Sequence, residues 1–144
     1  MKFTARCSKW LQRKRRRNSK SFYFFNSTAS VVSYLLILYN SRNRVVRVGK
    51  LGTFDFEPGF YYYVGSAERL SRVKRHFGSK RRKWHIDYIS EVFEVLGAIL
   101  INLEECELAH KIKLTPIKGF GCSDCSCYSH LFYSKNFTIE YLFT

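Results

Sequence analysis

Acidic residues are missing from the first 54 positions, which nevertheless hold 13 of the chain's 25 lysines and arginines. From Asp55 onward, 12 basic residues are nearly balanced by 11 acidic ones, so the formal net charge of +14 arises mainly near the N-terminus. A local basic run returns between Arg69 and Lys83, with eight basic residues and no acidic one. Clustered positive charge is typical of proteins that bind polyanions. Nucleic acid is therefore the expected partner, and a basic surface without such a partner is the alternative.

Long apolar runs are also missing. Residues 29–39 are apolar but too few to cross a bilayer. No small-residue cleavage site follows Tyr39, so a signal peptide is not expected. The five cysteines are an odd number, and three of them lie within residues 122–127. This pattern fits a reducing compartment better than a disulfide framework. We expect a cytoplasmic protein with no membrane partner.

The length of 144 residues gives room for one domain with its own core. Residues 1–28 include an uninterrupted basic run at 13–17 and are expected to form a flexible N-terminal extension. A nucleic-acid-binding arm and a misassigned translation start are alternatives for this segment. Residues 29–144 are expected to form a single domain.

Apolar runs and breakers predict an α+β fold, a small antiparallel or mixed β-sheet flanked by about three helices. Strands are expected at 31–39, 45–48, 60–64 and 98–101, helices at 66–77, 84–96 and 103–114, and a terminal hairpin at 128–133 and 137–142. In the first helix, with Ser66 as candidate N-cap, Arg69, Arg72 and His76 recur at helical spacing. Such a polar stripe is either solvated or a site for an anion.

Several ordered motifs resemble the GIY-YIG nuclease superfamily. Residues 63–67 (Tyr-Val-Gly-Ser-Ala) and 72–77 (Arg-x-x-Arg-His-Phe) resemble the second half of its signature. With the blocks at 84–88, 105–109 and 119–132, they resemble one small, poorly characterised archaeal and bacterial GIY-YIG-like family, which is sometimes attached to DNA glycosylases. The resemblance covers about residues 30–133 and implies the GIY-YIG-like fold for the domain.

The resemblance also implies a site that hydrolyses phosphodiesters in DNA. In that family two strand tyrosines, a helix arginine and histidine, and a later glutamate surround the phosphate, with one divalent cation on the glutamate. The matching catalytic positions are Tyr34, Tyr63, Arg72, His76 and Glu105, with Glu105 as the ligand of Mg²⁺ or Mn²⁺. The residues expected to grip the DNA backbone, without sequence specificity, are Arg69, Arg75, Lys80, Arg81, Arg82 and Lys83. DNA is expected as the nucleic acid in preference to RNA, and a DNA repair enzyme is a candidate protein partner.

The first motif departs from the family pattern, because Val32-Ser33-Tyr34 stands where Gly-x-Tyr is expected. A phenol has an unperturbed pKa of about 10, so Tyr34 as a base requires the metal or Arg72 to lower its pKa. The alternative function is therefore a catalytically inactive nucleic-acid-binding module, or a docking subunit of a DNA repair enzyme.

Two further groups of residues suggest binding sites. Cys122, Cys125, Cys127 and His130 offer thiolate and imidazole ligands that suit zinc, with Cys106 as a spare thiol. Paired zinc knuckles are absent, so buried free thiols are the preferred interpretation and structural zinc is the alternative. Within residues 84–88, His85 and Asp87 would point about 200° apart on a helix. That segment is therefore expected to pack, with one of the two tying down a loop.

Overall fold

The computed structural model describes residues 9–12, 23–26, 32–78 and 81–139. Its strands are β1 Lys9–Gln12, β2 Tyr23–Asn26, β3 Ser33–Asn40, β4 Arg44–Arg47, β5 Thr53–Phe56, β6 Gly59–Ser66, β7 Glu94–Ile101, β8 Thr115–Pro116 and β9 Leu131–Ser134. Its helices are α1 Leu70–Lys74, α2 His85–Ser90 and α3 Glu105–Lys111, with 3₁₀ turns η1 Gly49–Leu51 and η2 Arg75–Phe77.

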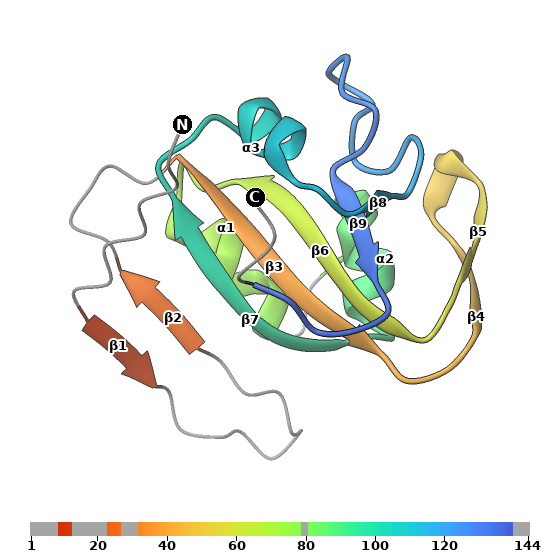
Figure 1. The fold of residues 1–144 in the computed structure, drawn as a ribbon, viewed down its shortest axis with the longest axis horizontal. Coiled ribbons are helices and arrows are strands. Elements are labelled where there is room, and N and C mark those ends of the chain that lie inside the picture. Colours follow the sequence, from red (N-terminus) through yellow and green to blue (C-terminus); the bar gives the residue numbers. More distant parts are fainter. Residues whose placement is uncertain (1–8, 13–22, 27–31, 79–80, 140–144) are drawn as a thin grey trace.

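Seven strands form one mixed sheet in the order β1-β2-β7-β3-β6-β9-β8, and β4 and β5 form a separate hairpin (Figure 1). Every neighbouring pair in the large sheet is antiparallel except β2 with β7. The long apolar strand β3 pairs with β6 on one side and β7 on the other, as its continuous apolar run predicts for a central strand. The predicted α+β class is therefore confirmed.

Helices cover both faces of the central strands. Because side chains alternate along a strand, Tyr34 and Leu36 of β3 join one core cluster and Leu35 and Ile37 join another. The first cluster contains side chains of α1 and α2, which lie behind the strands in Figure 1, and the second contains side chains of α3. The face under α1 and α2 also receives Tyr63, so both predicted tyrosines point the same way.

The predicted second helix is too long. The helix α2 ends at Ser90, and the chain enters strand β7 at Glu94. Ile89, Phe93 and Leu96 are apolar at helical spacing, so periodicity alone did not separate the helix from the strand. Pairing of β7 along the whole length of β3 decides the conformation of Glu94–Ile101, because this central position buries its apolar residues.

The first helix begins later than predicted. Strand β6 continues through Ser66, which pairs with Ser33 of β3, so Ser66 does not cap a helix. After α1 the backbone tightens into η2, where each residue turns by about 120° instead of about 100°. His76 is consequently turned into the core while Arg72 stays at the surface. The expected stripe of Arg69, Arg72 and His76 is therefore split between solvent and interior.

The predicted terminal hairpin does not form within the described residues. Strand β9 pairs with β6 and β8 instead, and residues 135–139 contain no strand, while the rest of the predicted partner lies outside the described residues. Of the predicted N-terminal extension, only β1 and β2 belong to the described part. In the described segments, no helix combines the length and hydropathy of a membrane span.

Candidate functional site

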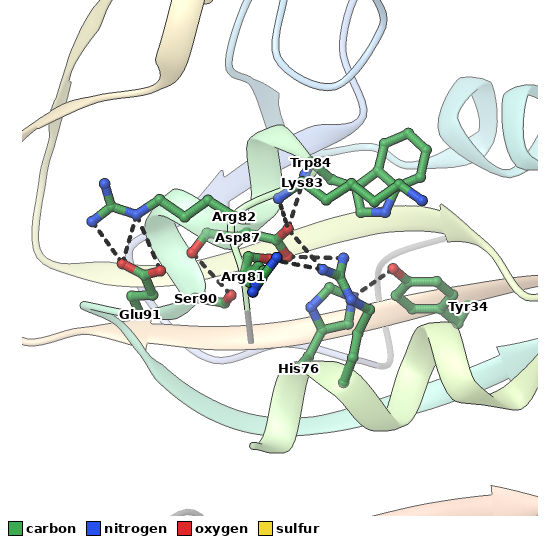
Figure 2. Close-up of polar contacts among 10 residues, drawn as sticks. Tyr34, His76, Arg81, Arg82, Lys83, Trp84, Asp87, Ser90 and Glu91 are labelled. Atoms are coloured by element: carbon green, nitrogen blue, oxygen red, sulfur yellow. Dashed lines mark hydrogen bonds and ion pairs between the residues drawn. The ribbon is translucent and has the colours of Figure 1, made fainter. Parts of the chain in front are cut away.

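Tyr34 and His76 meet on the face of the sheet covered by α1 and α2. The Tyr34 hydroxyl lies 2.7 Å from Nε2 of His76, although the two residues are 42 positions apart (Figure 2). Tyr34 comes from β3 and His76 from η2, and they are only 4% and 1% exposed. A buried phenol paired with an imidazole can pass a proton between two groups in a setting of low dielectric.

Gly65 on β6 makes room for the Tyr34 ring. The two residues are cross-strand partners, and a Cβ atom on Gly65 would overlap the ring. Tyr63 lies two residues earlier on the same face, with its ring centroid 6.2 Å from that of Tyr34. Tyr63 is 8% exposed and packs against Phe120 and Gly121. The fold therefore brings three predicted catalytic residues together: Tyr34, Tyr63 and His76.

Burial raises the pKa of both phenols. For Tyr34, burial is the largest cause, and neighbouring Tyr63 and the charge of Glu105 raise the pKa further. Burial and Glu105 raise the pKa of Tyr63 in the same way. Arg75 lowers both pKa values without outweighing burial. Both phenols are thus protonated at neutral pH, and Tyr34 can donate its hydrogen bond to His76 in the tautomer whose Nε2 carries no proton. A tyrosine that acts as a phenolate base needs a lowered pKa, and the residues around Tyr34 and Tyr63 do not lower it overall.

Arg72 and Arg75 have different surroundings. The Arg72 side chain is 40% exposed and lies 3.5 Å from Glu68, an i,i+4 surface pair of small energetic weight. The less exposed Arg75 donates two hydrogen bonds to Asp87, at 3.1 and 3.0 Å. Because Arg75 also lowers the pKa of Tyr34 and Tyr63, it is within electrostatic range of both. Arg75, predicted as a DNA-backbone contact, thus acts electrostatically on the two tyrosines.

Asp87 ties the start of α2 to the preceding loop. Its buried carboxylate accepts hydrogen bonds from the backbone amides of Lys83 and Trp84, at 2.7 and 2.8 Å, as well as from Arg75 (Figure 2). An acidic residue three positions after the N-cap commonly satisfies these unpaired amides. The loop-tying role expected within 84–88 therefore belongs to Asp87, whereas Trp84, expected to pack, is exposed.

Glu105, the predicted metal carboxylate, contacts His130. It is the first residue of α3, and its Oε1 lies 2.9 Å from Nδ1 of His130. The oxygen lies off the direction of the ring N–H, so this buried nitrogen has no aligned hydrogen bond among the described residues. Burial alone lowers the pKa of His130, but the contact with Glu105 raises it overall. Glu105 thus acts both on His130 and on the two tyrosines.

A Cys/His cluster that could hold a metal lies beside Glu105. One potential ligand atom from each of Cys106, Cys125, Cys127 and His130 lies within 4.8 Å of all the others. His130 Nε2 is 3.5 Å from the Cys125 sulfur and 4.0 Å from the Cys106 sulfur. Sulfur and imidazole nitrogen together favour zinc over Mg²⁺. The four described cysteines are free thiols.

Cys122 lies outside this cluster, although the sequence placed it in the predicted ligand set. Its thiol points toward the backbone oxygen of Tyr128, at 3.7 Å. Cys106 takes its place because the first turn of α3 lies beside the loop that precedes β9. The predicted set is corrected in this one position.

The predicted DNA-backbone contacts are mostly at the surface. Arg69, Arg81, Arg82 and Lys83 are exposed, and Lys80 lies outside the described residues. Arg82 is held by Glu91 through three hydrogen bonds of 2.8–3.1 Å, whereas Lys83 lies over the Trp84 ring (Figure 2). Four of the predicted contacts are therefore exposed cations, and one of them, Arg82, is already paired with an acidic side chain.

Sequence reasoning missed the roles of Cys106 and Arg75. Cys106 is 19 positions before Cys125 and belongs to another element, so it was named only as a spare thiol and not as a member of the ligand set. Arg75 was recognised only as one cation of a basic run. Asp87 on the next helix could have indicated the role of Arg75, because a carboxylate that becomes buried requires a nearby cation.

The fold and the site define a small α+β domain with a buried tyrosine–histidine pair and a Cys/His cluster. The chain belongs to the family described as Domain of unknown function DUF123, whose model matches residues 33–142. No curated protein and no solved structure matches the chain. The tyrosine–histidine pair and the Cys/His cluster both lie inside the matched region.

Proposed function

We propose that this protein is a metal-dependent endonuclease that hydrolyses phosphodiester bonds in DNA, as its resemblance to the GIY-YIG superfamily implies. The observation that carries the proposal is the buried hydrogen bond between Tyr34 and His76. The resemblance assigned these residues to separate motifs, and the fold joins them at 2.7 Å. Tyr63 lies beside them, and the charges of Arg75 and Glu105 act on both phenols.

Tyr34 and His76 act as a proton relay in this proposal. A water molecule beside Tyr34 gives a proton to the phenol oxygen while the phenol's own proton moves to Nε2 of His76. The hydroxide oxygen bonds to phosphorus as one ester P–O bond breaks, and the leaving oxygen takes a proton from solvent water. The raised pKa of Tyr34 is compatible with this role because the phenol is protonated at rest.

Two arginines supply positive charge for the phosphate. Arg75 is fixed by Asp87; its positive charge acts on both tyrosines, and the Asp87 carboxylate opposes it in part at Tyr34 and outweighs it at Tyr63. Arg72 is exposed, and its pair with Glu68 is weak, so its guanidinium can turn toward a phosphate at little energetic cost. A planar guanidinium suits the charge that develops on phosphate oxygens.

The Glu105 carboxylate suits a divalent cation with few protein ligands. Its Oε1 faces His130 and its side chain is about one-third exposed, so the second oxygen can ligate Mg²⁺ or Mn²⁺ together with water. The bound cation would stabilise negative charge on the phosphate. The Cys/His cluster does not suit Mg²⁺, because that ion prefers oxygen ligands.

A second candidate is a nucleic-acid-binding module without turnover. Tyr34 and Tyr63 are 96% and 92% shielded from solvent, so a phosphate can reach them only if neighbouring side chains move. The exposed cations of residues 69–83 need no such movement to contact a DNA backbone. This burial is the observation that favours the module.

The two functions are separated by one assay with two readouts. Purified protein is incubated with supercoiled plasmid, nicked plasmid and flap DNA, with Mg²⁺ or Mn²⁺, and both cleavage and gel-shift binding are measured. The variants are Arg72→Ala and Glu105→Gln; Glu105→Gln keeps an oxygen facing His130. Metal-dependent cleavage that is lost in both variants supports the endonuclease.

Binding with a steep salt dependence but without cleavage supports the module. If the protein neither binds nor cleaves DNA, both candidates are excluded, and a docking subunit of a DNA repair enzyme is favoured. Cleavage that persists unchanged in both variants would show that the catalytic centre lies elsewhere.

A further inference from the structure

We propose that Cys106, Cys125, Cys127 and His130 bind one zinc ion, and that Glu105 orients the histidine ligand from outside the coordination sphere. The four candidate ligand atoms come from two separate segments, the first turn of α3 and the loop before β9. The inference concerns metal binding and does not depend on the proposed nuclease activity.

The spacing of the ligand atoms agrees with tetrahedral zinc. With Zn–S near 2.3 Å and Zn–N near 2.0 Å, neighbouring ligands in a tetrahedron lie roughly 3.5–3.8 Å apart. The distances from His130 Nε2 to the sulfurs of Cys125 and Cys106 are 3.5 and 4.0 Å. No pair in the cluster exceeds 4.8 Å, so small side-chain rotations complete the site.

The two ring nitrogens of His130 have the surroundings that are typical of a metal-bound histidine. Nε2 faces the thiols, and Nδ1 faces the Glu105 carboxylate at 2.9 Å. Metal-bound histidines usually donate their second N–H to a carboxylate or carbonyl, which fixes the ring and strengthens the ligand. The ring is 2% exposed, and its Nδ1 otherwise has no hydrogen-bond partner among the described residues. A modest rotation would align that bond with Glu105.

The ion would connect helix α3 with the loop of residues 117–130. The loop of residues 117–130 has little regular structure, and its hydrogen bonds include Gly119 to Tyr128 and His130 to Phe120. The loop packs through Phe120 and Gly121 against Tyr63. A zinc ion would fix this loop to α3 and so stabilise the packing of Phe120 and Gly121 against Tyr63.

The experiment measures the metal content of the full-length protein, expressed without a histidine tag and purified without chelators. We expect one zinc ion per chain for the wild-type protein. Cys127→Ser and Cys106→Ser are expected to fall to well below half an equivalent. The matched control is Cys122→Ser, which changes a thiol of the same loop whose sulfur faces Tyr128 instead of the cluster. It is expected to retain the full equivalent.

Cobalt substitution tests the ligand set without any mutation that could prevent folding. Co²⁺ added to chelator-treated wild-type protein should give the intense thiolate charge-transfer and visible bands of a tetrahedral site, and stoichiometric Zn²⁺ should abolish them. Glu105→Ala should keep the bands but weaken zinc affinity about 10- to 100-fold, as loss of an orienting carboxylate does.

Three results would overturn the proposal. The first is folded wild-type protein that neither retains zinc nor gives the cobalt bands. The second is loss of zinc from Cys122→Ser as complete as that from Cys127→Ser. The third is a different resident metal, such as iron, in the wild-type protein. Nuclease activity enters none of these readouts, so failure of the nuclease proposal would leave them unchanged.

Discussion

Tyr34 depends on its neighbours for both its position and its protonation. Gly65 provides the space for the ring, His76 shares a hydrogen bond with its hydroxyl, and burial keeps its phenol protonated. The glycine of the Tyr-Val-Gly motif therefore has a packing role that the motif alone does not reveal. Its φ angle is ordinary, so only the absence of a side chain matters here.

Replacing Gly65 with alanine should displace the Tyr34 ring and break its hydrogen bond with His76. The added methyl group overlaps the ring, and such overpacking typically costs about 1–3 kcal/mol of unfolding free energy. Urea denaturation measures this loss. Gly78→Ala is the matched control, because it has open space and extended backbone and should change the free energy by less than about 0.5 kcal/mol. Equal stability of the two variants would contradict the packing.

The buried phenols should make the protein unstable in alkali. Their pKa values are raised on folding, so above about pH 10 the unfolded chain loses phenol protons that the folded chain retains. The free energy of unfolding should then fall by up to about 1.4 kcal/mol per pH unit for each phenol. Urea denaturation between about pH 9 and pH 11 tests this. Tyr34→Phe should show a shallower decline; an unchanged decline would mean that Tyr34 ionises normally in the folded protein.

At the scale of elements, the central strands were predictable and the connections between them were not. The apolar run of β3 and the aromatic run of β6 each carry a local signal. The change from α2 to β7 lacks one, because Phe93 and Leu96 suit either structure until β3 pairs with Glu94–Ile101. The 3₁₀ turn that separates His76 from Arg72 was equally invisible in the sequence.

The same limit applies to the candidate site. Motif matching named Tyr34 and His76, and the fold brought them together. Cys106 could not be named as a member of the cluster, because its partners lie across a helix and a loop, and only tertiary packing brings them close. Local patterns therefore identified elements and some chemistry, but long-range contacts determined the ligand set.

Arg75 should contribute much more to stability than Arg72, although both lie on the same short helical segment. Arg75 pairs with Asp87, which is buried and links η2 to α2, so its removal leaves a buried charge without its guanidinium. We expect Arg75→Ala to lower the unfolding free energy by about 3 kcal/mol. Arg72→Ala should lower it by less than about 0.5 kcal/mol. Similar values for the two variants in urea denaturation would contradict this description of the pair.

For the molecule as a whole, the basic excess lies in residues 1–54, and basic and acidic residues nearly balance from Asp55 onward. Within the domain, the segment between Arg69 and Lys83 keeps four exposed cations, Arg69, Arg81, Arg82 and Lys83. Arg81 and Arg82 differ in their availability, because Glu91 engages the guanidinium of Arg82. DNA held by these four exposed cations would be bound mainly through its phosphates.

The salt dependence of DNA binding tests this difference. Arg81→Ala should reduce the slope of log affinity against log salt by about 1, because one phosphate contact is lost. Arg82→Ala should reduce it less, because the Arg82 side chain is committed to Glu91. Fluorescence anisotropy over a series of salt concentrations gives both slopes. A larger effect for Arg82→Ala would place the DNA path on the Glu91 side.

The central claim is that the Tyr34–His76 pair moves the proton in phosphodiester cleavage. Its most direct measurement is the single-turnover rate of DNA cleavage by wild-type protein and by Tyr34→Phe, which removes one hydroxyl group. Tyr62→Phe, the same change on the opposite face of the sheet, is the control. We predict that Tyr34→Phe is slower by about 100-fold or more while Tyr62→Phe stays near the wild-type rate. Equal rates for wild-type protein and Tyr34→Phe would contradict the claim.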